Sequence, residues 1–181
     1  MPKVTPKHSF LIQSFAFAEC ILNLQKLEEK CAPEFVSIKG KIFGQAAETV
    51  SRDGVPLFGG QGAMLSMFYL LLVFPQELQK NYKSDFGEID ISEAEKIADE
   101  KVSISKDTYS KPIPALTHFR NALAHGRVDW SNGNLVIEDQ RTRKGGTEDY
   151  CAEFSMEALG KILQELNLAM FHFIKSRYGN G

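Results

Sequence analysis

The chain has 181 residues, which is enough for one domain with a sizeable core. Hydrophobic residues make up 43% of it and charged residues 24%, and this balance excludes an intrinsically disordered chain. The formal net charge of −2 excludes a polycationic binder, so any contact with nucleic acid must come from a local basic patch.

Cysteine usage and hydropathy indicate a cytoplasmic protein. The three cysteines form no CxxC pair, and their odd number makes a poor disulfide framework. Reduced thiols are typical of the cytosol. The N-terminal residues lack the small-residue cleavage site of a signal peptide. The most apolar run, residues 62–75, is shorter than the roughly 20 residues that span a bilayer, so we expect no membrane contact.

Helical periodicity dominates the first half of the chain. Residues 8–31 repeat apolar side chains at helical spacing, and residues 35–51 show a weaker pattern of the same kind. The glycine-rich residues 54–62 are interpreted as a turn, because the GK[ST] ending of a phosphate-binding loop is missing. Residues 63–82 are predicted to form the most buried helix, with a kink near Pro75.

Residues 83–111 are mixed in character. We expect a loop, a short acidic helix from about 92 to 101, and then a polar stretch. Ser92 and Glu95 match a capping box, with Ser92 as N-cap. The next helix is predicted over residues 112–125, because proline is tolerated in a first turn.

After that helix the pattern changes to period two. Residues 128–130 and 135–137 are predicted as strands, and the Asn-Gly pair at 132–133 is a strong hairpin signal. A further strand is predicted over 147–154, before a last helix over 156–178. The fold class that we expect is mainly α, a helical bundle with a small β-hairpin insertion between the last two helices.

The helix over residues 112–125 has an unusual polar face. At about 100° per residue, three apolar side chains form a stripe that faces the core: Leu116, Phe119 and Leu123. Asn121, His125 and His118 fall within roughly 60° of one another on the opposite side, and Arg120 lies on the flank. We expect these polar side chains to be exposed together.

The residue types on this face suit an anion. His125 lies near the negative end of the helix dipole, which favours its protonated form, and histidine exchanges protons near neutral pH. Arg120 offers a fork of donors that matches phosphate oxygens. The residues alone therefore indicate a phosphate site with a titratable group, and a polar helix face without function is the alternative.

The string RNALAH at residues 120–125 resembles the Rx4H signature of the HEPN superfamily (higher eukaryotes and prokaryotes nucleotide-binding), with Asn after the Arg. The resemblance implies a single HEPN-like domain over residues 1–181, with the hairpin insertion at about 127–154, that pairs into a homodimer. It implies RNA cleavage without a metal, in which the ribose 2′-OH attacks the adjacent phosphate and leaves a cyclic phosphate. Arg120 and His125 would act in this reaction, and Asn121 would support their geometry.

The resemblance also suggests a toxin or defence effector, with an antitoxin as a second partner beside RNA. One toxin branch carries a Tyr two residues after the His, which a partner enzyme modifies; Arg127 stands there in this chain, so regulation of that kind is not expected. Basic or polar side chains that would contact RNA are His118, Arg127, Arg141, Arg143 and Lys144. A solubilising charged turn is the alternative for residues 141–144.

No spacing of His, Cys, Asp and Glu matches a zinc site, and we predict neither a metal nor a cofactor. Two functions remain open. The first is the metal-independent endoribonuclease, which the presence of both Arg120 and His125 favours. The second is a non-catalytic HEPN-type module that binds nucleotide or RNA and acts as a sensor or partner protein.

Overall fold

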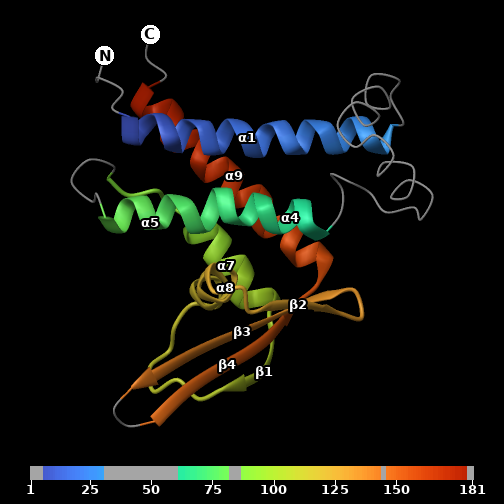
Figure 1. The fold of residues 1–181 in the computed structure, drawn as a ribbon, viewed down its shortest axis with the longest axis vertical. Coiled ribbons are helices and arrows are strands. Elements are labelled where there is room, and N and C mark those ends of the chain that lie inside the picture. Colours follow the sequence, from blue (N-terminus) through green and yellow to red (C-terminus); the bar gives the residue numbers. More distant parts are fainter. Residues whose placement is uncertain (1–5, 31–60, 82–86, 144–145, 179–181) are drawn as a thin grey trace.

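A computed structural model of the chain describes residues 6–30, 61–81, 87–143 and 146–178. The helix predicted over 35–51, most of the turn predicted over 54–62, and Lys144 lie outside these residues. In Figure 1 the long helices form the upper part of the molecule and a β-sheet forms the lower part, with two short helices between them.

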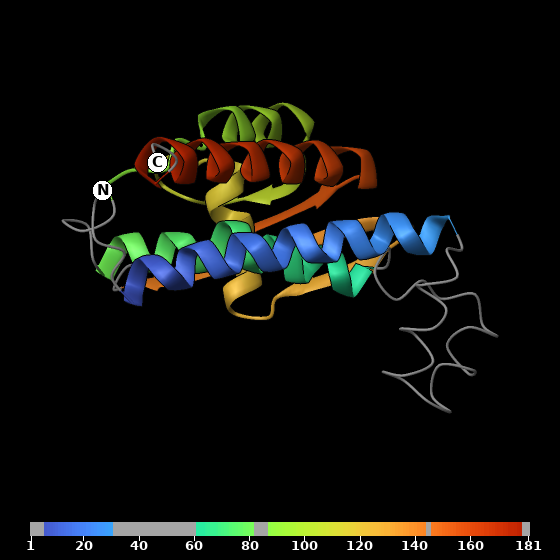
Figure 2. The same ribbon diagram turned by 90° about the horizontal axis from the view of Figure 1, so that it is seen from above.

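Three long helical segments make the upper layer. They are α1 (Pro6–Glu29), α9 (Met156–Tyr178) and a continuous helix built from α4 (Gln61–Phe68), the π-helical turn η1 (Tyr69–Val73) and α5 (Phe74–Asn81). The continuous helix runs nearly along α1 in both views, and α9 crosses them in Figure 1 (Figures 1 and 2). Both α1 and α9 contact η1, so the π-helical turn lies at the centre of this layer.

The π-helical turn lies directly before Pro75, where the sequence predicts a kink. Proline at position 75 has no N–H, and its ring would clash with the carbonyl four residues earlier in a regular α-helix. The backbone N–H of Phe74 instead donates to the carbonyl of Tyr69, five residues back. The wider turn lets the helix continue to Asn81, although Pro75 is buried within it.

The prediction of a mainly α fold is wrong, because the chain forms a mixed α and β structure with a four-stranded antiparallel sheet. The strands are β1 (Ser103–Asp107), β2 (Val128–Ser131), β3 (Asn134–Arg143) and β4 (Gly146–Phe154), in the order β1-β4-β3-β2. The expected hairpin was too small for two reasons: β3 continues through the polar residues 138–143 along β4, and β1 adds the edge strand beside β4.

The Asn-Gly hairpin turn is confirmed. Asn132 has φ 51° and Gly133 has φ 79°, so both central residues adopt the left-handed conformation that a two-residue hairpin needs. Ser131 pairs with Asn134 directly across this turn.

Two short helices connect the layers. The predicted acidic helix is confirmed as α7 (Ser92–Lys101), but its capping box is wrong: Ile91 occupies the N-cap, and the N–H of Ser92 donates to Oδ1 of Asp90 at 3.1 Å. The second short helix is α8 (Ala115–Ala124). It starts later than predicted because Pro114 is its N-cap, and a carboxylate oxygen of Asp99 on α7 accepts the N–H of Ala115 at 2.7 Å.

Helix α8 is buried on two sides. It contacts η1 and α7 on the helical side and β3 on the sheet side. The Phe119 ring lies edge-on to Phe68 of α4, with centroids 4.7 Å apart, and stacks at 5.5 Å on Phe154 of β4. The hydrophobic core therefore runs continuously from the helices through α8 to the inner face of the sheet.

Candidate functional site

The predicted site occupies the last turn of α8 and its C-cap. The N–H groups of His125 and Gly126 donate to the carbonyls of Asn121 at 3.1 Å and Leu123 at 3.2 Å. Gly126 has φ 66°, the left-handed conformation in which glycine commonly ends a helix. His125 is the C-cap residue, and its side chain is exposed at this turn.

His118 does not lie on an exposed face. Its side chain is 0% exposed, so the prediction that it shares an accessible surface with Asn121 and His125 is wrong. His118 lies opposite the apolar stripe of α8, but the sheet covers that side of the helix as well. Tyr150 of β4 stacks on the His118 ring, with centroids 3.8 Å apart and planes 7° apart, and Tyr109 lies edge-on at 4.6 Å.

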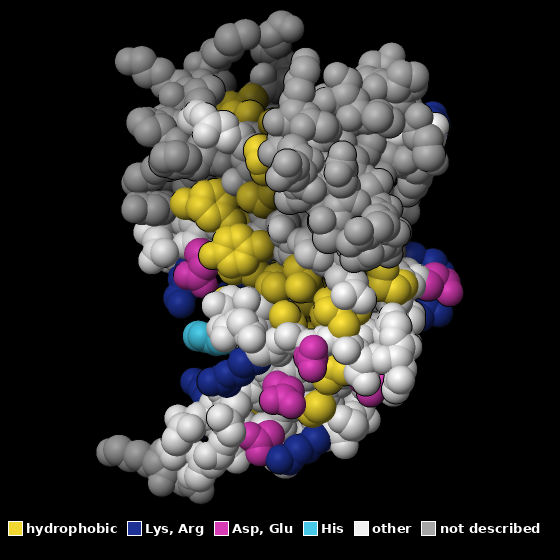
Figure 3. Space-filling view, turned by 45° about the vertical axis from the view of Figure 1, so that its right-hand side comes forward, with side chains coloured by type: hydrophobic (Ala, Val, Ile, Leu, Met, Phe, Trp, Pro, Cys, Tyr) yellow, Lys and Arg dark blue, Asp and Glu magenta, His cyan; other side chains and the backbone are white. Residues whose placement is uncertain are grey.

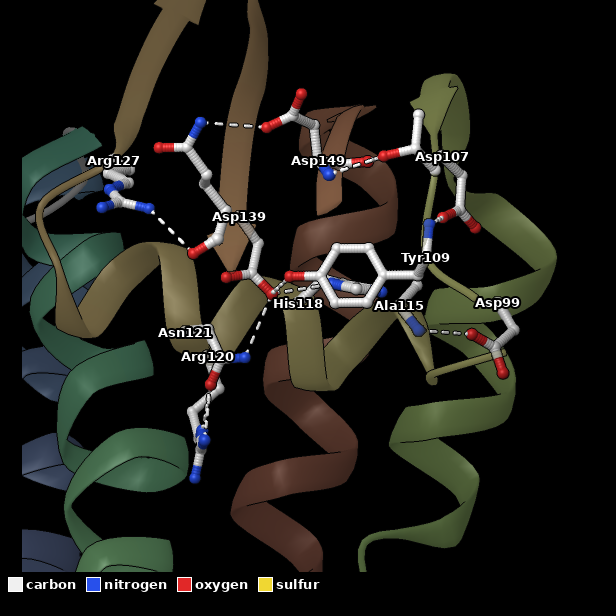
Figure 4. Close-up of polar contacts among 12 residues, drawn as sticks. Asp99, Asp107, Tyr109, Ala115, His118, Arg120, Asn121, Arg127, Asp139 and Asp149 are labelled. Atoms are coloured by element: carbon white, nitrogen blue, oxygen red, sulfur yellow. Dashed lines mark hydrogen bonds and ion pairs between the residues drawn. The ribbon is translucent and has the colours of Figure 1, made fainter. Parts of the chain in front are cut away.

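Asp139 on β3 is the polar centre of the contact between helix and sheet (Figure 4). One of its oxygens, Oδ2, accepts three hydrogen bonds. They come from the Tyr109 hydroxyl at 3.1 Å, from Nδ1 of His118 at 2.8 Å and from the Asn121 side-chain amide at 3.1 Å. Asp139 is buried, and these donors satisfy its charge in place of water.

The hydrogen bonds also determine the charge of Asp139 and the positions of the protons on His118 and Tyr109. Burial alone would raise the pKa of Asp139, but the hydrogen bonds from His118, Asn121 and Tyr109 outweigh it and hold that pKa below 3.8, the ordinary value. An ionised carboxylate can only accept, so Nδ1 of His118 must carry a proton. Burial, followed by the charge of Asp139, raises the pKa of Tyr109 to about 12, so its hydroxyl remains a donor at neutral pH.

Arg120 is held by its neighbour in the chain. Its Nε donates to Oδ1 of Asn121 at 3.2 Å, and its Nη2 donates to the same oxygen. On the other side, Nη1 lies 3.6 Å from Oε1 of Glu77 on α5. The Arg120 side chain is 22% exposed and lines a cleft of about 740 Å³ that also contacts Lys80 of α5 and Glu95 of α7.

Arg120 and His125 do not meet within one copy of α8. Five residues separate them, which places them about 140° apart around a helix. Arg120 extends toward α5 and away from Asp139 (Figure 4), whereas His125 lies at the exposed end. Among the residues that the structure describes, none hydrogen-bonds to the His125 ring.

The predicted RNA-contacting cations are spread over the sheet side. Arg127 is exposed and donates to the carbonyl of Gln140 at 3.3 Å. Arg141 and Arg143 are exposed near the end of β3, and Arg143 lies 3.5 Å from Glu148. Figure 3 shows Lys and Arg side chains interspersed with Asp and Glu on the lower part of its face, so the charges do not form one large basic surface there.

The comparisons with known proteins give the family. The family model described as HEPN pEK499 p136 matches residues 11–176. This chain is a HEPN protein. A search of curated proteins and a search of solved structures found no match. No helix in the described part of this HEPN protein combines the length and apolar character of a membrane span.

Family membership is consistent with a nuclease or a nucleotide-binding module. Residues 120–125 lie at the end of α8, as the sequence predicts, but the side chains from other elements that contact or support Arg120 and Asn121 could not be predicted. Asp139, Tyr109 and Glu77 lie 18, 12 and 43 residues from Asn121 or Arg120 in the chain, and no local pattern marks them. Asp139, Tyr109 and Glu77 come close to this part of α8 only when the sheet and α5 pack against it.

Proposed function

We propose that this HEPN protein is a metal-independent endoribonuclease. The observation that carries the proposal is that one short helix presents Arg120, held in a defined orientation by Asn121, and ends in the exposed His125. The family match supports the choice of nucleic acid chemistry over other phosphate chemistry.

The reaction needs one proton acceptor, one proton donor and a cation. The ribose 2′-OH gives its proton to a base as its oxygen bonds to the adjacent phosphorus. The bond from phosphorus to the 5′-oxygen then breaks, and that oxygen takes up a proton. A cyclic phosphate and a 5′-OH remain. His125 exchanges the protons, and Arg120 stabilises the negative charge that develops on the phosphate oxygens. The guanidinium supplies the positive charge that a metal ion supplies in other nucleases.

Two copies of the chain complete the site. Because Arg120 and His125 face different directions on α8, one copy does not bring both to a single phosphate. A two-fold axis beside this helix end would place Arg120 of one copy near His125 of the other, and would supply two histidines, one as acid and one as base. Sedimentation should then give twice the chain mass of 20.3 kDa.

Exposed cations on the sheet side are the proposed path for the RNA backbone. Arg127, Arg141 and Arg143 would attract phosphates in a manner that depends on salt. His118 is fully buried and is no longer assigned to RNA contact. As a physiological role we propose a toxin or defence effector that a protein antitoxin restrains.

A non-catalytic HEPN module is the second candidate. The observation that favours it is the ion pair between Arg120 and Glu77, which lowers the positive charge available to a phosphate. Such a module would bind RNA or nucleotide through Arg120 without cleaving it.

Alanine variants separate the two candidates. Purified wild type, Arg120→Ala and His125→Ala are incubated with mixed RNA, and fragments are followed on a gel. His172→Ala is the matched control, since it removes an exposed histidine from α9. The endoribonuclease proposal expects cleavage by wild type and His172→Ala and none by the other two. Binding without cleavage by wild type supports the second candidate, and equal cleavage by His125→Ala removes His125 from the mechanism.

A further inference from the structure

Three side chains donate hydrogen bonds to Asp139, and of these only Asn121 also contacts Arg120 of the proposed site. The Asn121 amide donates to Oδ2 of Asp139 at 3.1 Å, and its Oδ1 accepts Nε of Arg120 at 3.2 Å. We propose that Asp139 is a positioning residue for the RNA-cleavage site, which sets the orientation of Arg120 through Asn121. This inference rests on the proposed function, because it assigns a partner to the arginine of that site.

The Asn121 amide has one favourable orientation between its two neighbours. Asp139 is ionised, so it only accepts, and it must face the amide nitrogen. Arg120 has donors and no acceptor, so it must face the amide oxygen. A flipped amide would put an oxygen against the carboxylate and N–H groups against the guanidinium. Both neighbours therefore select the same orientation.

Asn121 in turn fixes the plane of the guanidinium. Two nitrogens of Arg120, Nε and Nη2, donate to the single Oδ1 of Asn121. Two bonds from a planar group define its rotation, as in other forked arginine contacts. The third nitrogen, Nη1, makes no contact with Asn121 and lies 3.6 Å from Oε1 of Glu77 on α5. A phosphate oxygen that displaces Glu77 would meet an arginine that is already oriented.

The rest of the network keeps Asp139 itself in place. His118 holds the same oxygen from within α8, and its ring is fixed between Tyr150 and Tyr109. Tyr109 holds it from the segment that precedes α8. Because α8 and this segment both donate to one carboxylate of β3, rotation of Asp139 away from Asn121 would break two further hydrogen bonds.

Nuclear magnetic resonance of the Arg120 Nε–H tests the link directly. The signal is assigned with Arg120→Lys and followed in the full chain by its exchange with water. We expect a slowly exchanging Nε–H in wild type and fast exchange in Asp139→Ala. Tyr109→Phe is the matched control: it removes one hydrogen bond from the same oxygen but leaves Asn121 in contact, so the signal should remain. An unchanged Arg120 signal in folded Asp139→Ala overturns the proposal, and so does its loss in Tyr109→Phe.

A wild-type measurement covers the case in which Asp139→Ala does not fold. The Asn121 side-chain amide should exchange with water more slowly than that of Asn23, which is exposed on α1. Equal exchange rates for the two amides overturn the proposal.

Cleavage kinetics supply the functional readout. Asp139→Ala should lower kcat about tenfold to a hundredfold, the range that misplacement of a catalytic group produces, with KM changed less than about threefold. Tyr109→Phe leaves the bonds from His118 and Asn121 to Asp139 in place, so it should lower kcat less than Asp139→Ala does, and equal kcat losses in the two variants overturn the positioning role. If wild type cleaves no RNA, the proposed function fails, while the Arg120 signal still decides whether Asp139 orients the arginine.

Discussion

The ion pair between Glu77 and Arg120 should weaken RNA binding. At the observed 3.6 Å between Oε1 and Nη1, two unit charges attract by about 1 kcal/mol in bulk water and about 5 kcal/mol at an effective dielectric constant of 20. The Glu77 side chain is 45% exposed and that of Arg120 is 22% exposed, so solvent screens the pair. Pairs of this kind contribute roughly 0–1 kcal/mol.

Glu77→Gln keeps the shape of the side chain and removes its charge. We expect the free energy of unfolding to change by less than about 1 kcal/mol. RNA no longer has to displace a carboxylate from Arg120, so binding should tighten by up to about fivefold, which corresponds to about 1 kcal/mol.

Fluorescence anisotropy with labelled 2′-O-methyl RNA measures this change, because the blocked 2′-oxygen prevents cleavage during the assay. Glu157→Gln is the control for net charge. It removes one negative charge from an exposed pair with Lys161 on α9. At a fixed salt concentration, Glu77→Gln should bind more tightly than Glu157→Gln. Equal affinities would show that the pair does not compete with RNA, and weaker binding by Glu77→Gln would refute the reasoning altogether.

Three further predictions follow from the site and its supports. If two copies share one site, a mixture of Arg120→Ala and His125→Ala should recover part of the cleavage activity; no recovery after demonstrated subunit exchange would contradict this arrangement. Burial, followed by nearby carboxylates, raises the pKa of Tyr109 and of Tyr150 to about 12, so ultraviolet titration should find both protonated at pH 11 and stability should fall as the pH rises from 10 toward 12; titration of all tyrosines near 10 would be inconsistent with this. Burial alone would raise the pKa of Asp139, but the hydrogen bonds to its carboxylate lower it by more. The contribution of the charged carboxylate to stability is therefore complete above pH 3.8, and it is lost as the pH falls through the lower pKa of the folded state. The stability difference between wild type and Asp139→Asn, measured by denaturant unfolding, should shrink below that pH, and a constant difference would argue against it.

The helices could be predicted from the sequence because their signals are local. Apolar periodicity located α1 and α9, and the end of the helix predicted over residues 112–125 agrees with the end of α8 to within one residue. The Asn-Gly turn at 132–133 was equally clear, because its left-handed conformations suit few other residue pairs.

The sheet could not be predicted in full because its pairing is not local. All five residues of β1 are exposed, and its one large apolar side chain, Ile104, is 52% exposed, so it shows no alternation of buried and exposed positions. Its partner strand lies more than forty residues further along the chain, since Ser103 pairs with Glu153. Residues 140–143 of β3 are exposed, and they pair with β4 without a buried face.

Only part of the candidate site could be predicted from the sequence. Arg120, Asn121 and His125 could be chosen as candidates by their residue types and spacing. His118 was misplaced because a histidine opposite an apolar stripe is expected in solvent unless a second surface covers it. That surface is the sheet, and Asp139 on it accepts a hydrogen bond from the Nδ1–H group of the buried His118.

The central claim is that the end of α8 cleaves RNA without a metal, and the chemistry of the fragment ends tests it most directly. Wild type and His125→Ala are incubated with a defined RNA in excess EDTA, and the products are analysed by mass spectrometry. The account predicts fragments with a 2′,3′-cyclic phosphate and a 5′-OH from wild type, and intact RNA from His125→Ala. Cleavage that stops in EDTA and returns with Mg²⁺, or fragments that carry a 5′-phosphate, would contradict it.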